Sequence, residues 1–213
     1  MPLLTISNSI IESLTKNEIL SDVVQDQKFE PKGLLTISYG NSNEVALGNT
    51  LGIEDTQTTP KFQFTFNPTN KDSSSTLEEI KDTDLFTLIL TDPDAPSRTD
   101  KKWSEYAHFI HTNLLLKSQS NASQDSDFFS TELNLDSQGK ELLSYQGPAP
   151  PQGTGKHRYV FLLYKQPHGV EDLKAPKDRI NWGYGEPATG VAKYAKENDL
   201  ELYAVNFFHA ENK

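Results

Sequence analysis

The apolar residues among the first twenty positions recur at helical spacing. They are Ile6, Ile10, Ile11 and Leu14, and charged residues occupy the opposite face. This pattern predicts an N-terminal helical arm over residues 1–20. Two interpretations of the arm stay open: a short helix packed on the domain, and an arm available to a partner.

From residue 34 onward the period changes to two, which is typical of β-strands. In Lys61–Phe66 three Phe residues share one face, and Lys, Gln and Thr share the other. Leu85–Thr91 is an almost continuous apolar run, as expected of a central strand. The predicted strands are Leu34–Tyr39, Lys61–Phe66, Leu85–Thr91, Tyr106–Asn113, Leu142–Gln146, His157–Tyr164 and Leu202–Phe208. Many strands with few helices favour antiparallel sheets, and most simply a β-sandwich in an all-β dominated fold.

One later helix and two loops complete the predicted organisation. The helix is expected near residues 187–199, with Pro187 in its first turn. Its expected apolar stripe is Ala188, Val191, Ala192 and Ala195. Residues 67–84 and 117–127 are polar enough to predict surface loops. Strands continue on both sides of each loop, so residues 1–213 are predicted to form a single domain with a β-sandwich core over 34–213.

Composition and charge exclude several classes of protein. The chain has 213 residues, no cysteine and a formal net charge of −10. Without cysteine there is no disulfide framework, thiol nucleophile or thiolate metal site. The negative charge argues against nucleic-acid binding and against adhesion to anionic membranes. No transmembrane segment of about 20 apolar residues is present, and no secretory signal begins the chain, which predicts a cytoplasmic location.

The first cluster of candidate chemistry follows the apolar strand, at Thr91–Arg98. Pro93 and Pro96 force the chain out of the sheet, so a stiff loop presents Asp92 and Asp94 at the end of the sheet. The alternative is a turn in which the two carboxylates only accept hydrogen bonds from nearby amides.

Two further segments carry histidines. His108 and His111 point to opposite faces of one predicted strand, so their spacing is not that of a metal-binding pair. Residues 147–159 form a segment rich in Pro and Gly, which differs from a phosphate-binding P-loop and leads into His157 and Tyr159. Residues 147–170 contain Lys156, Arg158 and Lys165 and no acidic residue. Two imidazoles and a phenol next to Asp92 predict a pocket for a phosphate or carboxylate group.

These segments resemble the phosphatidylethanolamine-binding protein family, which includes Raf-kinase-inhibitor-type proteins and fungal carboxypeptidase Y inhibitors. The resemblance rests on Thr91–Arg98, on Trp103 followed by His108-Phe109, and on Gly147–Tyr164. Asn181–Gly185 and Asn206–Phe208 are similar to the fungal inhibitor branch. The resemblance implies a Greek-key antiparallel β-sandwich with a few peripheral helices.

The resemblance also implies a site and a function. The implied pocket lining is Asp92, His108, Ala149, Pro151, His157 and Tyr159, with Asp94 and Trp103 at the border. No catalytic residue, metal or cofactor is implied, and the expected ligand is a phosphate-bearing head group or another small anion. The implied activity is non-enzymatic inhibition of a serine carboxypeptidase, with kinases and GTPase regulators as further partners. By resemblance, vacuolar or membrane-associated locations accompany the cytoplasmic one.

Two other functions remain as alternatives. A hydrolase or lyase would use Asp92, His108 and His157 as acid–base groups, and a two-His, two-carboxylate metal site is its variant. The sequence has no Gly-x-Ser-x-Gly motif and no Cys–His pair to supply a nucleophile. A soluble lipid carrier would need a long apolar tunnel, whereas the pocket segments are short and polar. The sequence therefore favours head-group recognition and a protein that is not an enzyme.

Overall fold

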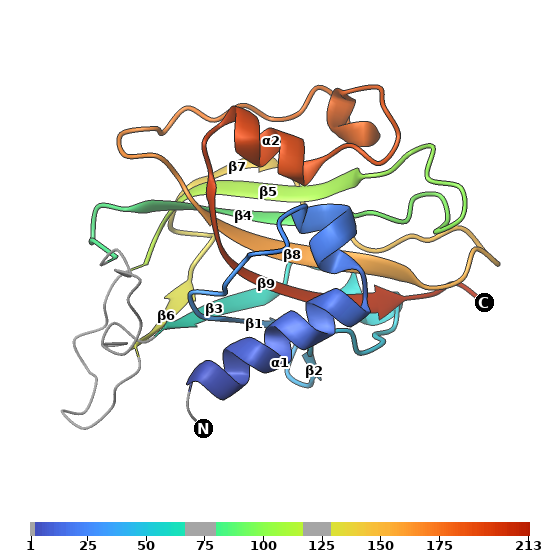
Figure 1. The fold of residues 1–213 in the computed structure, drawn as a ribbon, viewed down its shortest axis with the longest axis horizontal. Coiled ribbons are helices and arrows are strands. Elements are labelled where there is room, and N and C mark those ends of the chain that lie inside the picture. Colours follow the sequence, from blue (N-terminus) through green and yellow to red (C-terminus); the bar gives the residue numbers. More distant parts are fainter. Residues whose placement is uncertain (1–2, 67–79, 117–128) are drawn as a thin grey trace.

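Two antiparallel sheets and a layer of helices make up the fold (Figure 1). The structure is a computed structural model that describes residues 3–66, 80–116 and 129–213. The helices are α1 (Leu3–Lys16) and α2 (Val191–Glu197), with a π-helical turn at Leu20–Val24 and 3-10 turns at Glu54–Thr56 and Asn181–Gly183. The strands are β1 (Leu34–Tyr39), β2 (Asn43–Glu44), β3 (Lys61–Phe66), β4 (Leu85–Asp92), β5 (Tyr106–Leu115), β6 (Phe129–Leu133), β7 (Lys140–Leu143), β8 (His157–Lys165) and β9 (Glu201–Ala210).

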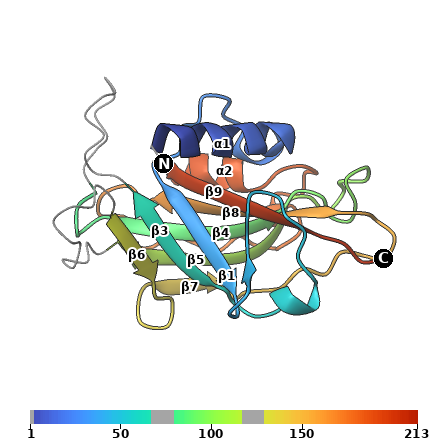
Figure 2. The ribbon, with the colours of Figure 1, turned by 90° about the horizontal axis from the view of Figure 1, so that it is seen from below.

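The strands form a smaller and a larger sheet. The smaller sheet has the order β2-β1-β3-β6, and the larger has the order β7-β5-β4-β8-β9. The chain passes between the sheets after β3, after β5 and after β6. All pairings within the sheets are antiparallel, which confirms the predicted β-sandwich. Figure 2 shows α1 and α2 on the same side of the larger sheet.

The central strands of the larger sheet are buried on both faces. Between the sheets, Leu90 of β4 and Phe161 of β8 pack against β1 and β3. On the other face, Ile89 and Val160 pack against the helices. Successive residues of a strand point to opposite faces, so a strand with a core on each side needs apolar residues at nearly every position. This double burial explains the continuous apolar run that the sequence shows before Asp92.

Most of the predicted strands are confirmed, and two differences have local causes. β6 was missed because its five residues alternate weakly and include Ser130, Thr131 and Glu132. β7 covers Lys140–Leu143, whereas the sequence predicted Leu142–Gln146. The backbone N–H of Gln146 still donates to the carbonyl of His108, so pairing with β5 resumes beyond the strand end.

The prediction of a helix near residues 187–199 is wrong at its start. α2 begins at Val191, and Ala188 has a φ of 55°, which is left-handed and interrupts a right-handed helix. Pro187 therefore precedes the helix and lies outside its first turn. Gly190 stands immediately before α2 because a Cβ there would lie 2.6 Å from the side chain of Glu105.

The N-terminal arm is docked on the larger sheet. Ile10 and Leu14 of α1 are buried in the core beneath the helices, and the hydroxyl of Ser13 donates to the carbonyl of Leu47 at 2.8 Å. This favours a packed helix for the part of the arm that the structure describes. The predicted loop at 117–127 and most of the loop at 67–84 lie outside the described residues. Within the ranges that are described, no helix has the length and apolarity needed to cross a membrane.

Candidate functional site

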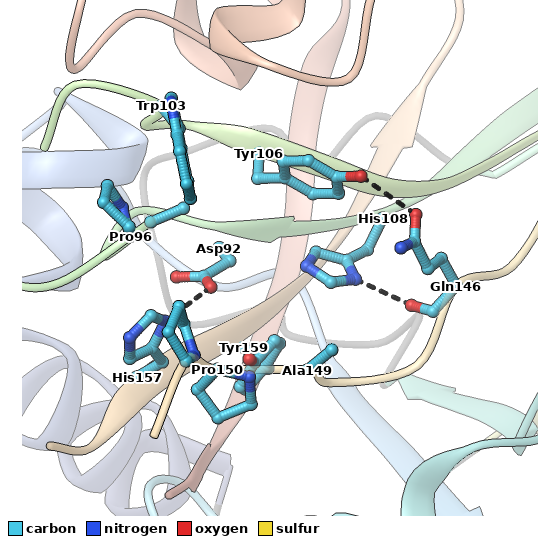
Figure 3. Close-up of a pocket in the computed structure, with 12 residues that line it drawn as sticks. Asp92, Pro96, Trp103, Tyr106, His108, Gln146, Ala149, Pro150, His157 and Tyr159 are labelled. Atoms are coloured by element: carbon cyan, nitrogen blue, oxygen red, sulfur yellow. Dashed lines mark hydrogen bonds and ion pairs between the residues drawn. The ribbon is translucent and has the colours of Figure 1, made fainter. Parts of the chain in front are cut away.

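A small cavity opens at the end of the sandwich where β4 and β9 finish and β5 and β8 begin (Figure 3). Its volume is about 170 Å³. This corresponds to roughly five or six water molecules at their volume in the liquid, which suits a head group and is too small for an acyl chain. The cavity is lined by Asp92, Ala95, Pro96, Trp103, Tyr106, His108, Gln146, Ala149, Pro150, Pro151, His157 and Tyr159.

The structure brings together every predicted site residue except Asp94. Sequence reasoning missed five lining residues, of which Tyr106 and Gln146 bring polar side chains and the others are Ala95, Pro96 and Pro150. Tyr106 could have been found, because it shares a strand face with His108. Gln146 gave no local signal, because its position depends on pairing between distant strands. Ligand binding by these residues stays a prediction.

Asp92 and His157 form a buried pair at the base of the pocket. His157 Nδ1 lies 2.8 Å from Asp92 Oδ2, and both side chains are almost fully buried. Asp92 Oδ1 accepts a hydrogen bond from the backbone N–H of Asp94 at 2.7 Å. Burial lowers the pKa of His157, but the hydrogen bond and charge of Asp92 outweigh it and hold this pKa above its usual value.

The second nitrogen of His157 is also a donor. His157 Nε2 lies 3.1 Å from Thr154 Oγ1, and the Thr154 hydroxyl donates its hydrogen to the carbonyl of Pro151 at 2.7 Å. A hydroxyl has one hydrogen, so Thr154 Oγ1 accepts from Nε2–H. Both ring nitrogens then carry hydrogen, and His157 is an imidazolium paired with the Asp92 carboxylate.

His108 has the opposite protonation. Its Nδ1 lies 2.7 Å from the carbonyl oxygen of Gln146, and a carbonyl can only accept, so Nδ1 carries the hydrogen. Burial lowers the pKa of His108, and the positive charges of Arg179 and His157 lower it further against the raising effect of Asp92. The ring is therefore neutral at pH 7, with an unprotonated Nε2.

Aromatic rings form the wall and the mouth of the pocket. The Tyr159 ring packs edge-on against His108 at 5.3 Å and stacks on His157 at 6.4 Å. Burial raises the pKa of the Tyr159 phenol, and the nearby Asp92 raises it further, so the phenol stays protonated. Trp103 is 42% exposed at the mouth, where Lys102 Nζ lies 5.2 Å from the centre of the indole ring.

Asp94 does not border the pocket, which corrects the sequence prediction. Its carboxylate is fully buried and accepts from Nε and Nη2 of Arg158 at 2.8 and 2.7 Å, and from the Arg158 backbone N–H at 2.9 Å. Arg158 also donates to Asp22 Oδ2 and to the carbonyl of Asn17, each at 2.8 Å. The Asp94–Arg158 pair thus holds the N-terminal arm against β8, on the face away from the cavity.

A third buried carboxyl lies close to this end of the sheet. Burial raises the pKa of Glu105 to about 8, partly offset by a hydrogen bond of 3.0 Å between its Oε2 and Thr91 Oγ1. Thr91 Oγ1 also accepts from Trp182 Nε1 at 3.1 Å and lies 3.2 Å from the carbonyl of Tyr106. The Thr91 hydroxyl donates to Glu105 Oε2, and because burial raises its pKa to about 8 the Glu105 carboxyl is mostly protonated at pH 7.

The loop that forms the rim of the pocket is held by the C-terminal tail. The backbone N–H of Gly153 donates to the carbonyl of Asn212 at 3.0 Å, and the Asn212 side chain donates to the carbonyl of Pro150 at 3.3 Å. Gly153 has a φ of 73°, a left-handed conformation that glycine adopts without strain. The tail therefore helps to place the rim residues over the cavity.

Asp92, His157 and Thr154 have the outline of a catalytic triad, with a hydroxyl beside a histidine and the histidine beside an acid. The protonation is wrong for that role. A histidine that already carries both hydrogens cannot take one from Thr154, and the Thr154 hydroxyl points its hydrogen to Pro151. In the part of the chain that the structure describes, no group of three His, Asp or Glu side chains is placed to hold a metal ion.

Comparisons with known proteins agree with the fold and the site. The family model described as "Phosphatidylethanolamine-binding protein" matches residues 25–208. The carboxypeptidase Y inhibitor of Saccharomyces cerevisiae is 51% identical over 209 residues, covering 95% of each chain. An uncharacterized protein of the same yeast is 38% identical over 208 residues, covering 97% of this chain and 95% of the relative.

Two solved structures are also similar. A crystal structure of carboxypeptidase Y inhibitor complexed with the cognate proteinase has a TM-score of 0.86 and 49% identity, and it covers 97% of each chain. The phosphatidylethanolamine-binding protein from Plasmodium vivax has a TM-score of 0.72 at 21% identity, covering 95% of this chain and 97% of that one. At 21% identity, the similarity to the Plasmodium vivax protein supports the fold alone.

Proposed function

This chain belongs to the phosphatidylethanolamine-binding protein family, and from that membership we propose that it inhibits a serine carboxypeptidase of the carboxypeptidase Y type. The observation that carries the proposal is the 51% identity with a carboxypeptidase Y inhibitor over 95% of each chain. The similarity of the backbone to an inhibitor in complex with its cognate proteinase, over 97% of each chain, supports it further.

The protein is not an enzyme, in agreement with its similarity to a protease inhibitor. The pocket supports this from its own chemistry. A general base needs an unprotonated nitrogen facing a nucleophile, and His157 donates from both nitrogens. His108 has an unprotonated Nε2, but the partner of its other nitrogen is the carbonyl of Gln146. This carbonyl fixes the orientation of the ring and is not a nucleophile.

The direct test is inhibition of purified carboxypeptidase Y by the full chain. We expect the protease to stop removing the C-terminal residue of a peptide substrate once about one equivalent of this chain has been added to it. A protease that keeps full activity in a tenfold excess of this chain would contradict the proposal. Heat-unfolded chain serves as the control for substrate competition.

We further propose that the N-terminal arm makes the inhibitory contact. The buried anchors Ile10 and Leu14 lie in the second half of α1, whereas Ile6 is partly buried and Asn8 and Ser9 are exposed. Removing residues 1–8 keeps both anchors and should abolish most of the inhibition. Undiminished potency would reject the contact, and an unchanged unfolding temperature would show that the shortened arm is still docked.

A second candidate function is binding of a small phosphate-bearing anion in the pocket. The cavity and the polar side chains of His108, His157 and Tyr159 in its lining support it. His108→Ala and His157→Ala should each weaken binding of a phosphate compound by more than about 1 kcal/mol, the scale of a hydrogen bond to a charged group. Unchanged binding in both variants, measured by calorimetry, would contradict the assignment of anion binding to this pocket. Kinase and GTPase-regulator partners, and the cellular location, stay predictions.

A further inference from the structure

His108 presents a hydrogen-bond acceptor to the cavity. The carbonyl of Gln146, 2.7 Å away, holds a hydrogen on Nδ1, and because the buried ring is neutral, Nε2 has a free lone pair. In Figure 3 the ring turns Nε2 away from Gln146, towards the side of the cavity where Asp92 and His157 lie. A ligand atom that meets Nε2 must therefore bring its own hydrogen.

The other imidazole does not replace this missing donor. Nδ1–H of His157 is directed to Asp92, and Nε2–H is directed to Thr154. The charges near the cavity also cancel in pairs, since Asp92 neutralises His157 and, behind them, Asp94 neutralises Arg158. A phosphate dianion would thus meet the Nε2 lone pair and the Asp92 carboxylate, and the nearby guanidinium of Arg179 already directs N–H groups to the carbonyls of Ala107, His108 and Ser144.

The remaining groups around His108 come from three neighbouring segments. Tyr106 precedes it on β5, with ring centres 5.0 Å apart, and Tyr159 of β8 packs against its edge. Arg179 donates to the backbone carbonyls of His108 and Ala107, each at 3.0 Å. Arg179 and His157 are the cations near the ring, and both oppose a positive charge on it, while Asp92 favours one.

From this geometry we propose that the pocket selects a phosphomonoester in its singly protonated form, whose P–OH donates to Nε2 of His108, over dianions and over phosphodiesters. A phosphodiester has no P–OH and can bind in this way only if His108 itself takes up a proton. The bound complex holds one proton between a phosphate oxygen and Nε2, whichever of the two atoms carries it. This inference rests on the anion-binding function proposed above, and it deepens that function.

The probes that separate these possibilities are phosphorylcholine and glycerophosphorylcholine. Both carry the same trimethylammonium group, which has no N–H, and only the first is a monoester. The second pKa of a phosphomonoester is about 6, so the affinity of the wild-type protein for phosphorylcholine should fall about fifty-fold between pH 6 and pH 8. Glycerophosphorylcholine should bind at least about tenfold more weakly than phosphorylcholine at pH 6, because it lacks the donor.

Proton uptake gives an independent reading. Calorimetry at pH 7.5 in two buffers of different ionisation enthalpy should show uptake of about one proton for each phosphorylcholine bound. Affinity that is constant from pH 6 to pH 8, with no proton uptake, would overturn the selectivity and leave the anion-binding function standing. Absence of binding by both probes at both pH values would overturn the two together.

A pair of variants assigns the effect to His108. In His108→Gln the amide N–H₂ reaches the former Nε2 position and can donate to a dianion, so most of the pH dependence should disappear. His111→Gln is the matched control on the same strand, because His111 Nε2 bonds the carbonyl of Gln138 at 2.8 Å and does not line the cavity. The control should keep the full pH dependence. If His108→Gln fails to fold, the number of protons that the wild-type protein takes up on binding phosphorylcholine decides whether the singly protonated form is selected.

Discussion

Two ion pairs lie side by side at the end of the larger sheet and serve different regions of the molecule. His157 and Arg158 are consecutive on β8, and their partners Asp92 and Asp94 are two residues apart around Pro93. The His157 pair faces the cavity, and the Arg158 pair faces the helices and the N-terminal arm. One strand and one loop thereby support both the pocket and the arm.

The difference between the pairs lies in their chemistry. A guanidinium stays charged at every physiological pH and binds a carboxylate through two parallel hydrogen bonds, so the Arg158 pair is a permanent structural tie. An imidazolium loses its proton within reach of neutral pH, so the His157 pair responds to pH. The ion pair of Arg158 therefore stays charged at every physiological pH, whereas the ion pair of the adjacent His157 changes its charge with pH.

The largest expected effect comes from breaking the permanent pair. Asp94→Asn leaves the Arg158 charge buried with only the partly exposed Asp22 as a charged partner, which should lower the free energy of unfolding by roughly 3–5 kcal/mol. Urea unfolding measures this loss. Asp92→Asn is the matched control in the same loop, and a loss in the Asp94 variant no larger than in the control would erase the distinction between the two pairs.

Glu105 sharpens the comparison, because it is a buried acid that stays neutral instead of pairing with a cation. Its pKa rises from 4.5 in the unfolded chain to about 8 in the folded protein. Between these two pH values the unfolded state binds fewer protons than the folded state. The free energy of unfolding should therefore fall with rising pH by up to roughly 1.4 kcal/mol per pH unit. Glu105→Gln should flatten this slope in urea titrations from pH 5 to pH 8. An unchanged slope would mean that Glu105 is already ionised.

Breaking the titratable pair should have a smaller effect with a definite pH window. The pKa of His157 is raised in the folded state, so the pair stabilises fully below pH 6.5 and its contribution is lost as pH rises through the raised pKa. Asp92→Asn should therefore lower stability by about 1–3 kcal/mol at pH 6 and by less at pH 9. NMR titration of the His157 ring should show a lower pKa in the variant, and an equal or higher pKa would contradict the assignment.

The smallest effect is expected at the solvent side of Arg158. Burial raises the pKa of Asp22, but Arg158 and Lys101 outweigh it and hold the pKa below its usual value. Because the pair is partly exposed, Asp22→Asn should cost no more than about 1 kcal/mol. Hydrogen exchange should nevertheless become faster in α1, while pocket affinity stays unchanged. Faster exchange confined to the pocket segments would show that the two regions are not separated as described.

The sequence predicts the central strands of the larger sheet well because burial on both faces leaves an almost unbroken apolar pattern. It does not predict β6, which is short and polar, and it misplaces the start of α2. Helix rules favour Pro187 in a first turn, but packing turns Ala188 to a left-handed conformation and lets α2 begin at Val191. Such a conformation is decided by tertiary contacts that local patterns do not contain.

Prediction of the site from the sequence is limited by tertiary contacts in the same way. Alternation along β8 correctly places His157 and Arg158 on opposite faces, and the loop after β4 correctly presents Asp92 to the cavity. The error at Asp94 arose because alternation does not continue through a turn, so the loop sequence did not reveal which aspartate meets which partner. Gln146 and the carbonyl that fixes the His108 tautomer come from a strand pairing across 38 residues.

The bond between Arg158 and the carbonyl of Asn17 joins positions that lie 141 residues apart. During synthesis α1 leaves the ribosome first, and the guanidinium that fastens its end is made only when β8 appears. Contacts this distant form slowly, because a long chain segment must be closed before they stabilise anything. The arm is therefore among the first parts of the molecule to exist, and a chain cut short before β8 lacks this tie to its end.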